Sequence, residues 1–230
     1  MTARVPTRGV FFDVDFTLIY PGRTFQGAGY QDFCRAHGVD VDPGAFERAV
    51  VAASSLLAPT GDVYDPEIFI HYTKRIIEGM GGAGDGVDRA ARDIYDEWSA
   101  CHHFELYDDV PGVLRDLHAA GVKIGLISNT QRSMTAFASH FALEGLFAVA
   151  ISSFDHGYMK PHPSIFESAL QQVAAKPHEA VMVGDSVAHD IEGALRLGMR
   201  AVLVARSAQV PNAPADVPMI RSLRELPRLL

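Results

Sequence analysis

Four short apolar segments of the sequence each run directly into polar side chains, and this repeat limits the folds open to the chain. The segments are residues 9–14, 122–127, 148–151 and 180–183. Helical patterns separate the last three, and alternation of buried strands with helices is typical of a parallel sheet covered on both faces. We therefore predict an α/β fold with a doubly wound, Rossmann-like parallel sheet, whose ligands bind beyond the carboxyl ends of the strands.

The stretch from residue 18 to residue 109 interrupts this alternation. It shows four helical patterns and no convincing strand, at residues 26–37, 43–57, 66–78 and 87–102. Proline–glycine pairs at 21–22 and 111–112 provide turn and helix-start signals near its two edges. We expect an inserted all-helical cap domain over residues 18–109, and an α/β catalytic core built from residues 1–17 and 110–230.

The composition excludes several classes of protein. With 48% apolar and 21% charged residues in 230, the chain has enough apolar material for one sizeable core. The net charge of −8 and the lack of a Lys/Arg run argue against nucleic acid as a partner. No apolar run approaches the roughly 18 residues of a membrane span. The amino terminus does not resemble a signal peptide, and two cysteines suit a reducing compartment, so we expect a cytoplasmic protein.

Asp13 and Asp15 stand two positions apart at the end of the first apolar segment. Because strand periodicity is two, both carboxylates should point to the same face. Such a pair attracts a divalent cation, and one carboxylate can act as a nucleophile while the other handles a proton. Taken alone, the pair is equally compatible with a solvated strand end.

Polar residues at the next strand ends favour the chemical interpretation. Ser128 and Asn129 precede a helical pattern whose first N–H groups favour phosphate. Lys160, which follows the segment at 148–151, can neutralise a carboxylate and a phosphoryl oxygen together. We expect all three residues to lie around one phosphate group.

The fourth segment adds two more carboxylates, Asp185 at its end and Asp190 in the helical pattern that follows. Mg²⁺ prefers oxygen ligands in octahedral geometry. Asp13, the main-chain carbonyl of Asp15, and Asp185 are therefore the ligands that we expect for Mg²⁺.

Together these residues resemble the four motifs of the haloacid dehalogenase-like (HAD) hydrolase superfamily, in the same order and over most of the chain. The residues that match are Asp13, Asp15 and Thr17 in motif one, Ser128 in motif two, Lys160 in motif three, and Asp185 and Asp190 in motif four. The segment at 18–109 occupies the place of the family's type 1 helical cap. One departure is Phe16, since the family often has glycine there; an aromatic residue should stiffen the turn and narrow the mouth of the site.

The resemblance implies a Mg²⁺-dependent phosphatase acting on a small phosphate ester. Family dehalogenases lack an acidic residue at the position of Asp15, whereas phosphatases carry one. In the implied mechanism Asp13 is the nucleophile, Asp15 the general acid and base, and Lys160 a catalytic cation. The phosphate-binding residues would be Thr17, Ser128, Asn129 and Lys160. Asp190 would orient Lys160 or a metal-bound water.

Three alternatives stay open on the sequence. A phosphomutase of the same superfamily would use the same residues. A receiver-type signalling domain also accepts phosphate on an aspartate, but its motif order differs and it has no long helical insertion. A catalytically silent binding protein could retain the scaffold. The sequence chooses neither the substrate nor between a monomer and a homodimer.

Other patterns point less clearly to function. Residues 79–84 match the Gly-x-Gly-x-x-Gly fingerprint, but a helical pattern precedes them, so we expect a helix–helix loop. Cys101, His102 and His103 suggest a metal site, yet adjacent helical residues point in different directions, and we expect ordinary structural roles. The insert's aromatic and basic residues are expected to be mostly core or surface: Arg23, Tyr64, His71, Tyr72, Lys74, Arg75 and Trp98.

Overall fold

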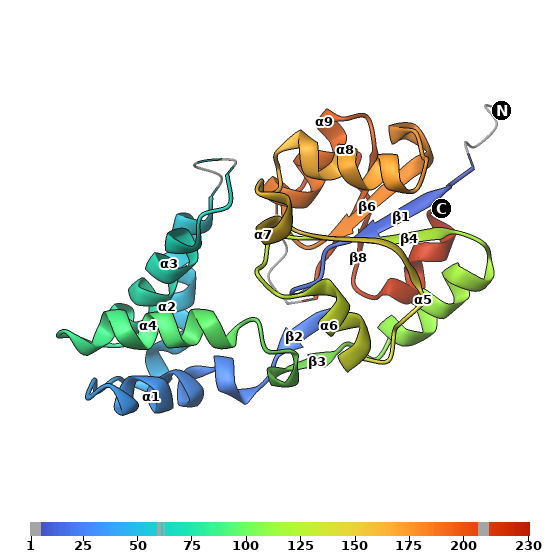
Figure 1. Cartoon of the computed structure of the whole chain (residues 1–230). Coiled ribbons are helices and arrows are strands. Elements are labelled where there is room, and N and C mark those ends of the chain that lie inside the picture. Colours follow the sequence, from blue (N-terminus) through green and yellow to red (C-terminus); the bar gives the residue numbers. More distant parts are fainter. Residues whose placement is uncertain (1–5, 59–60, 62, 207–211) are drawn as a thin grey trace. The chain divides into compact units, whose positions relative to one another are not determined.

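The computed structural model describes residues 6–58, 61, 63–206 and 212–230, which form two compact units (Figure 1). The core unit takes its described residues from the ranges 1–20, 62–64 and 106–230, and the helical unit takes its own from 21–61 and 65–105. Each unit has its own apolar interior and is described separately.

The described core unit is built on a six-stranded parallel sheet, and the parallel arrangement is the one that the sequence predicts. Its strands are β1 (Gly9–Phe12), β4 (Lys123–Ser128), β5 (Phe147–Ser152), β6 (Ala180–Gly184), β7 (Arg200–Val204) and β8 (Met219–Ile220), in the spatial order β5-β4-β1-β6-β7-β8. β1 is central and pairs with β4 on one side and β6 on the other. All four residues of β1 are buried, which explains its continuous apolar run.

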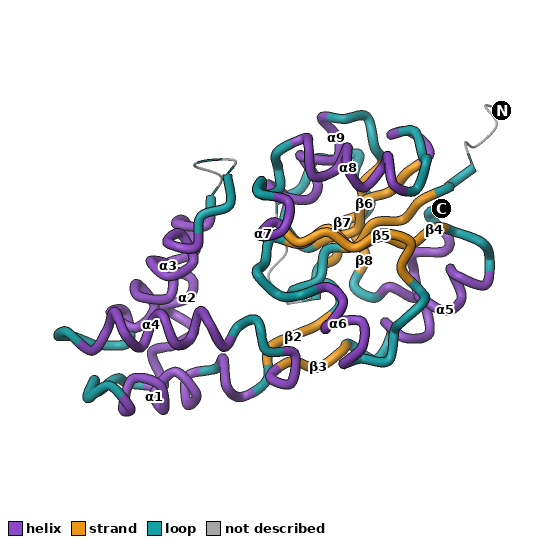
Figure 2. Tube along the Cα trace, viewed as in Figure 1, coloured by secondary structure: helices purple, strands orange, loops and turns teal. Residues whose placement is uncertain are grey.

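Helices cover both faces of this sheet (Figure 2). They are α5 (Val110–Ala119), α6 (Met134–His140), α7 (Ser153–His156), α8 (Pro163–Gln172) and α9 (Glu192–Arg196). α8 and α9 lie on one face and α5 lies on the other. Phe11 of β1, Met182 of β6 and Phe166 of α8 belong to one buried apolar cluster. The fold class, an α/β core with a helical insert, is thus confirmed.

The carboxyl-terminal part of the core differs in detail from the prediction. β7 was not expected, although its sequence is apolar. Of the loop expected at 207–219, residues 207–211 lie outside the described residues, and Met219 already belongs to β8. The last predicted helix is the 3-10 helix η7 (Leu223–Arg228), which contains Pro227. Proline lacks a backbone N–H, so Pro227 interrupts the hydrogen-bond series that a regular α-helix would need here.

The described residues of the helical unit form four α-helices: α1 (Gly27–Ala36), α2 (Phe46–Ala53), α3 (Pro66–Gly79) and α4 (Gly86–Glu97). Asp65 accepts a hydrogen bond from the Glu67 N–H and Pro66 occupies the first turn, which together start α3. α3 packs against α2 and α4, and α1 packs against α4. The glycine-rich segment joins α3 to α4, as expected for a helix–helix loop. α4 ends at Glu97, five residues before the predicted limit of 102.

Two short strands that the sequence analysis missed stand where the chain passes between the units. β2 (Ile19–Pro21) pairs with β3 (Phe104–Leu106) in a two-stranded sheet. The expectation that residues 18–109 hold no strand was therefore wrong at both edges. A three-residue strand is too short to show the period of two that identifies longer strands.

Most basic and aromatic side chains singled out in the insert have structural partners. Lys74 forms an ion pair with Asp88 at 2.6 Å, and the ring of Trp98 packs against Phe25 with centroids 4.6 Å apart. These contacts are typical of a solvated helix face and of a small aromatic core.

In the described part of the chain, no helix combines the length and the hydropathy needed to cross a membrane.

Candidate active site

The carboxyl ends of three neighbouring strands bring the predicted residues together. Asp13 follows β1, Ser128 ends β4, and Asp185 follows β6. The main-chain N–H of Asp13 donates to the carbonyl of Val183 at 2.9 Å, which continues the β1–β6 pairing past the end of β1. Parallel strands all present their carboxyl ends at one edge, and the polar side chains meet there.

Lys160 links two of the carboxylates inside the protein. Its Nζ donates to Asp13 Oδ1 at 2.6 Å and to Asp190 Oδ1 at 2.6 Å, and its side chain is only 2% exposed. Burial disfavours the ammonium form, but the charges of Asp13 and Asp190 outweigh burial and raise the pKa of Lys160 above its ordinary value. The lysine is thus held as a cation between two acids.

Hydrogen bonds that involve the backbone fix the positions of Lys160 and Asp190. Asn129 accepts a hydrogen bond from the Lys160 N–H at 2.7 Å and donates to the Lys160 carbonyl at 2.9 Å. Asp190 Oδ2 accepts from the Ser186 N–H at 3.0 Å. A Cβ atom added at Gly184 would collide with the Asp190 carboxylate, so the glycine before Asp185 is required for this approach. Asn129, which we expected at the phosphate, uses its side-chain amide to hold the lysine's backbone.

Asp13, Asp185 and Asp190 bring carboxylate oxygens within 4.8 Å of one another. Burial, opposed by the Lys160 charge, raises the pKa of Asp13 to about 6. Burial and the negative charges of Asp13 and Asp190 raise the pKa of Asp185 well above its ordinary value. One lysine cannot neutralise three acids, and a divalent cation with oxygen ligands fits this excess of negative charge.

Two hydroxyl groups accompany the acids. Ser128 Oγ is buried and makes no hydrogen bond to a described residue. A buried hydroxyl in this state is suited to bind an oxygen that arrives with a ligand. The Thr17 hydroxyl donates a long hydrogen bond, 3.5 Å, to Asp185 Oδ1, and the Thr17 main-chain carbonyl accepts from Arg206 at 2.8 Å. The structure therefore places Thr17 beside an acid of the cluster.

Arg132 is a residue of the site that the sequence analysis missed. Its Nη1 donates to both carboxylate oxygens of Asp15, at 2.9 and 3.2 Å, and its side chain is fully buried. Burial raises the pKa of Asp15, and the Arg132 charge opposes that rise. The helical pattern expected after Asn129 begins only at Met134, as α6, so Arg132 lies in the loop before that helix. Ser133, which caps α6 by accepting from the Ala136 N–H, was the available signal.

The turn that carries Asp15 holds Phe16 in a backbone conformation that favours glycine. Phe16 has φ of +62°, in the left-handed region that glycine enters most easily. Its N–H donates to the Ile19 carbonyl at 2.7 Å, which closes the turn. A side chain at this position therefore carries a conformational cost, and its ring is 43% exposed.

The fold and this arrangement define a hydrolase with an acidic site at the ends of parallel strands. The model of the haloacid dehalogenase-like hydrolase family matches residues 7–198, and the chain belongs to that family. It is 28% identical to the zebrafish (Danio rerio) haloacid dehalogenase-like hydrolase domain-containing protein 3, over 99% of this chain and 98% of that protein.

Two further proteins extend the comparison. The mouse (Mus musculus) N-acylneuraminate-9-phosphatase is 31% identical over 70% of this chain and 66% of its own length. Among solved structures, the putative HAD-hydrolase YfnB from Bacillus subtilis, bound to magnesium, gives a TM-score of 0.72 at 17% identity, covering 98% of this chain and 99% of that one. The structural similarity shows the shared fold, and the family assignment makes this chain an HAD-like hydrolase with a phosphatase among its relatives.

Proposed function

We propose that the protein is a Mg²⁺-dependent phosphatase that hydrolyses a small phosphate monoester through an aspartyl-phosphate on Asp13. The observation that carries this proposal is the convergence of Asp13, Asp185 and Asp190 around the Lys160 ammonium. A relative that is a phosphatase and a similar structure bound to magnesium support it. Asp13, the Asp15 carbonyl and Asp185 would hold Mg²⁺, which supplies positive charge to the phosphoryl oxygens when bound.

In the first half of the proposed reaction, a carboxylate oxygen of Asp13 attacks phosphorus and the bond to the ester oxygen breaks. Asp15 gives its proton to the departing alkoxide, so that an alcohol leaves. Lys160 holds the attacking carboxylate in place and neutralises charge on the transferring group. Ser128 Oγ donates to a phosphoryl oxygen, which satisfies its hydrogen-bonding capacity.

In the second half, Asp15 accepts a proton from water as the water oxygen attacks phosphorus. The bond between phosphorus and the Asp13 oxygen breaks, phosphate leaves, and both aspartates return to their starting states. We propose the insert at residues 18–109 as the cap that selects the substrate. An acidic side chain at position 15 favours this chemistry over carbon–halogen cleavage, which requires no proton for its leaving halide.

A phosphate-release screen over many small phosphate esters, with and without Mg²⁺, tests the proposed function. We expect Mg²⁺-dependent release of free phosphate from at least one class of ester. Mass balance with hexose phosphates distinguishes hydrolysis from isomerisation by a mutase. No release from any compound, by protein that is folded and loaded with Mg²⁺, would contradict the proposal.

Arg132 is expected to position Asp15 and to keep its carboxylate available as a base. Replacing Arg132 by methionine leaves the partly buried Asp15 without its counter-charge, so the pKa of Asp15 should rise further. Because the second half of the reaction needs the ionised form, the acid limb of kcat against pH should move to higher pH. We also expect about 3 kcal/mol lower stability, as for removal of one partner of a buried pair.

Two variants control this experiment. Arg132→Lys keeps a positive charge and should retain part of the wild-type pH profile. Arg115→Met removes an exposed arginine from α5 and should change neither stability nor activity. An unchanged pH profile in Arg132→Met would show that the arginine has no role beyond folding.

The acid cluster, formed by Asp13, Asp185 and Asp190, also predicts how Mg²⁺ affects the stability of the protein at different pH values. The folded protein raises the pKa of Asp13 to about 6, so its protonated carboxyl contributes stability at low pH. That contribution is lost as pH rises from the unfolded value near 4 through the folded value. Added Mg²⁺ replaces the lost protons, so it should raise the unfolding temperature more at about pH 7.5 than at about pH 5.

Thermal unfolding with excess Mg²⁺ or with EDTA, at both pH values, measures this difference. In Asp185→Asn, which lacks one proposed ligand, the difference should shrink. An equal effect of Mg²⁺ at the two pH values would contradict the assignment of the metal to this cluster.

A further inference from the structure

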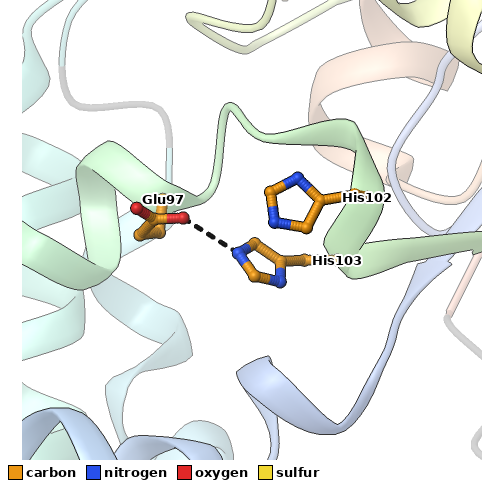
Figure 3. Close-up of side chains that lie close together, drawn as sticks. All are labelled: Glu97, His102 and His103. Atoms are coloured by element: carbon orange, nitrogen blue, oxygen red, sulfur yellow. Dashed lines mark hydrogen bonds and ion pairs between the residues drawn. The ribbon is translucent and has the colours of Figure 1, made fainter.

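Apart from the active-site acids, the described part of the chain holds one other group of three potential ligands close enough for a single metal ion. The group consists of Glu97, His102 and His103, whose ligand atoms lie within 4.8 Å of one another. All three residues belong to the helical unit. Figure 3 shows the carboxylate of Glu97 and one nitrogen of each histidine facing the same small space.

A tight turn brings these residues together. Glu97 is the last residue of α4, and the two histidines end the 3-10 helix η4 (Cys101–His103). The Ala100 N–H donates to the Glu97 carbonyl at 2.9 Å, which folds the connection back. Cys101 does not belong to this group, so the residues that come together are not the Cys-His-His set considered from the sequence.

The two histidine rings lie side by side although they are neighbours in the chain. Their centroids are 4.0 Å apart, with 46° between the ring planes. Adjacent residues of a regular α-helix would diverge, but η4 is a single turn at the end of which the backbone becomes extended. The rule used on the sequence therefore does not apply to this pair.

His103 is held in place before any ion binds. Its side chain is 17% exposed, its ring packs edge-on against Phe25 with centroids 5.4 Å apart, and its Nε2 lies 2.9 Å from Glu97 Oε2. Glu97 and His102 are exposed and can rotate. Ligand atoms about 2.0–2.2 Å from a zinc ion lie roughly 3–3.5 Å from each other, so small rotations of these two side chains complete the geometry.

We propose that Glu97, His102 and His103 bind a divalent transition-metal ion of the Zn²⁺ type. Two imidazoles and one carboxylate are a ligand set that zinc uses in proteins, and imidazole favours Zn²⁺, Cu²⁺ and Co²⁺ over Mg²⁺. A bound ion ties the end of α4 to η4, immediately before β3. The site is separate from the acid cluster of the proposed phosphatase and does not depend on that function.

Trp98 provides a direct probe, because it is the only tryptophan in the chain. It follows Glu97, and its ring packs against Phe25, which also contacts His103. Titration with Co²⁺ or Cu²⁺ in excess Mg²⁺ should quench its fluorescence in a saturable way, since open-shell ions quench nearby excited rings. Zn²⁺ should reverse the quenching caused by Co²⁺, because it binds imidazole more tightly and displaces that ion, and additional Mg²⁺ should not.

The main variant is His102→Ala, because His102 is exposed and its loss leaves the packing of Phe25 intact. We expect it to weaken metal binding by at least about tenfold, since loss of even an outer-shell partner has effects of that size. Glu97→Gln should weaken binding similarly while keeping the shape of the side chain. Calorimetry with Zn²⁺ should show this loss of affinity in both variants.

His37→Ala is a matched control. His37 also belongs to the helical unit and pairs with a carboxylate, that of Asp93 at 2.6 Å, but no second histidine joins that pair. This variant should bind metal like the wild type. Absence of saturable quenching in the wild-type protein, or equal binding by wild type and His102→Ala, would overturn the proposal.

Discussion

Replacing Asp13 by asparagine is expected to lower phosphate release by at least about 10⁴-fold, the scale seen when a nucleophile of a covalent mechanism is removed. Asparagine has the same shape, and its Oδ1 can still accept from Lys160, so the core unit should stay folded. The amide oxygen is a far weaker nucleophile than a carboxylate, and the covalent intermediate cannot form. Turnover of the substrate found in the screen, at saturating Mg²⁺, measures the loss.

Measuring the stability of Asp13→Asn shows whether its loss of activity comes from the chemistry or from misfolding. Asp13 is a buried acid whose pKa burial raises, so removing its charge should leave the metal-free protein at least as stable as the wild type. Acid-quenched wild-type protein should carry one phosphoryl group by mass, and Asp13→Asn should carry none. Asp116→Asn, an exposed change on α5, should behave like the wild type. A variant at residue 13 that keeps turnover within tenfold would rule out Asp13 as the nucleophile.

The sheet could be predicted from the sequence because its strands are buried on both faces. β1, β4 and β6 carry continuous apolar runs, and each ends at polar residues that need a common environment. The four helices of the insert were equally clear, since their apolar residues recur with the helical period. β2, β3 and β8 have two or three residues each, too few to show a period, and they depend on pairing partners distant in sequence.

From the sequence, only those site residues could be placed that come directly after the end of a strand. Asp13 and Asp185 are in that position, whereas the partner of Asp15 depends on how the loop after β4 folds. Arg132 looks like a surface residue of a helix until the start of α6 is known, and only the fold shows that it is buried against Asp15. A helical pattern was expected where η6 (Val187–Ile191) places Asp190 beside Lys160, but its π-helical form had no sequence signal.

Replacing Lys160 by methionine is the second change with a large expected effect. Methionine has a similar length but no charge, so Asp13, Asp185 and Asp190 would face one another without the ammonium. Breaking a buried ion pair in this way typically costs about 3–5 kcal/mol of stability. Activity should also fall by about 10²–10³ or more, the range for loss of one group that stabilises the transition state.

The response of this variant to Mg²⁺ distinguishes the two roles of the lysine. A divalent cation can offset the repulsion among the three acids, so Mg²⁺ should restore much of the stability of Lys160→Met. Mg²⁺ cannot take the position of the Lys160 ammonium between Asp13 and Asp190, which the hydrogen bonds of Asn129 to the Lys160 backbone help to fix. Activity should therefore stay low. Lys123→Met, at an exposed position of β4, controls for loss of a lysine in the same unit. If Lys160→Met unfolded like the wild type in EDTA, the acids would have to be uncharged in the metal-free protein, and the charge balance inferred for the site would be wrong.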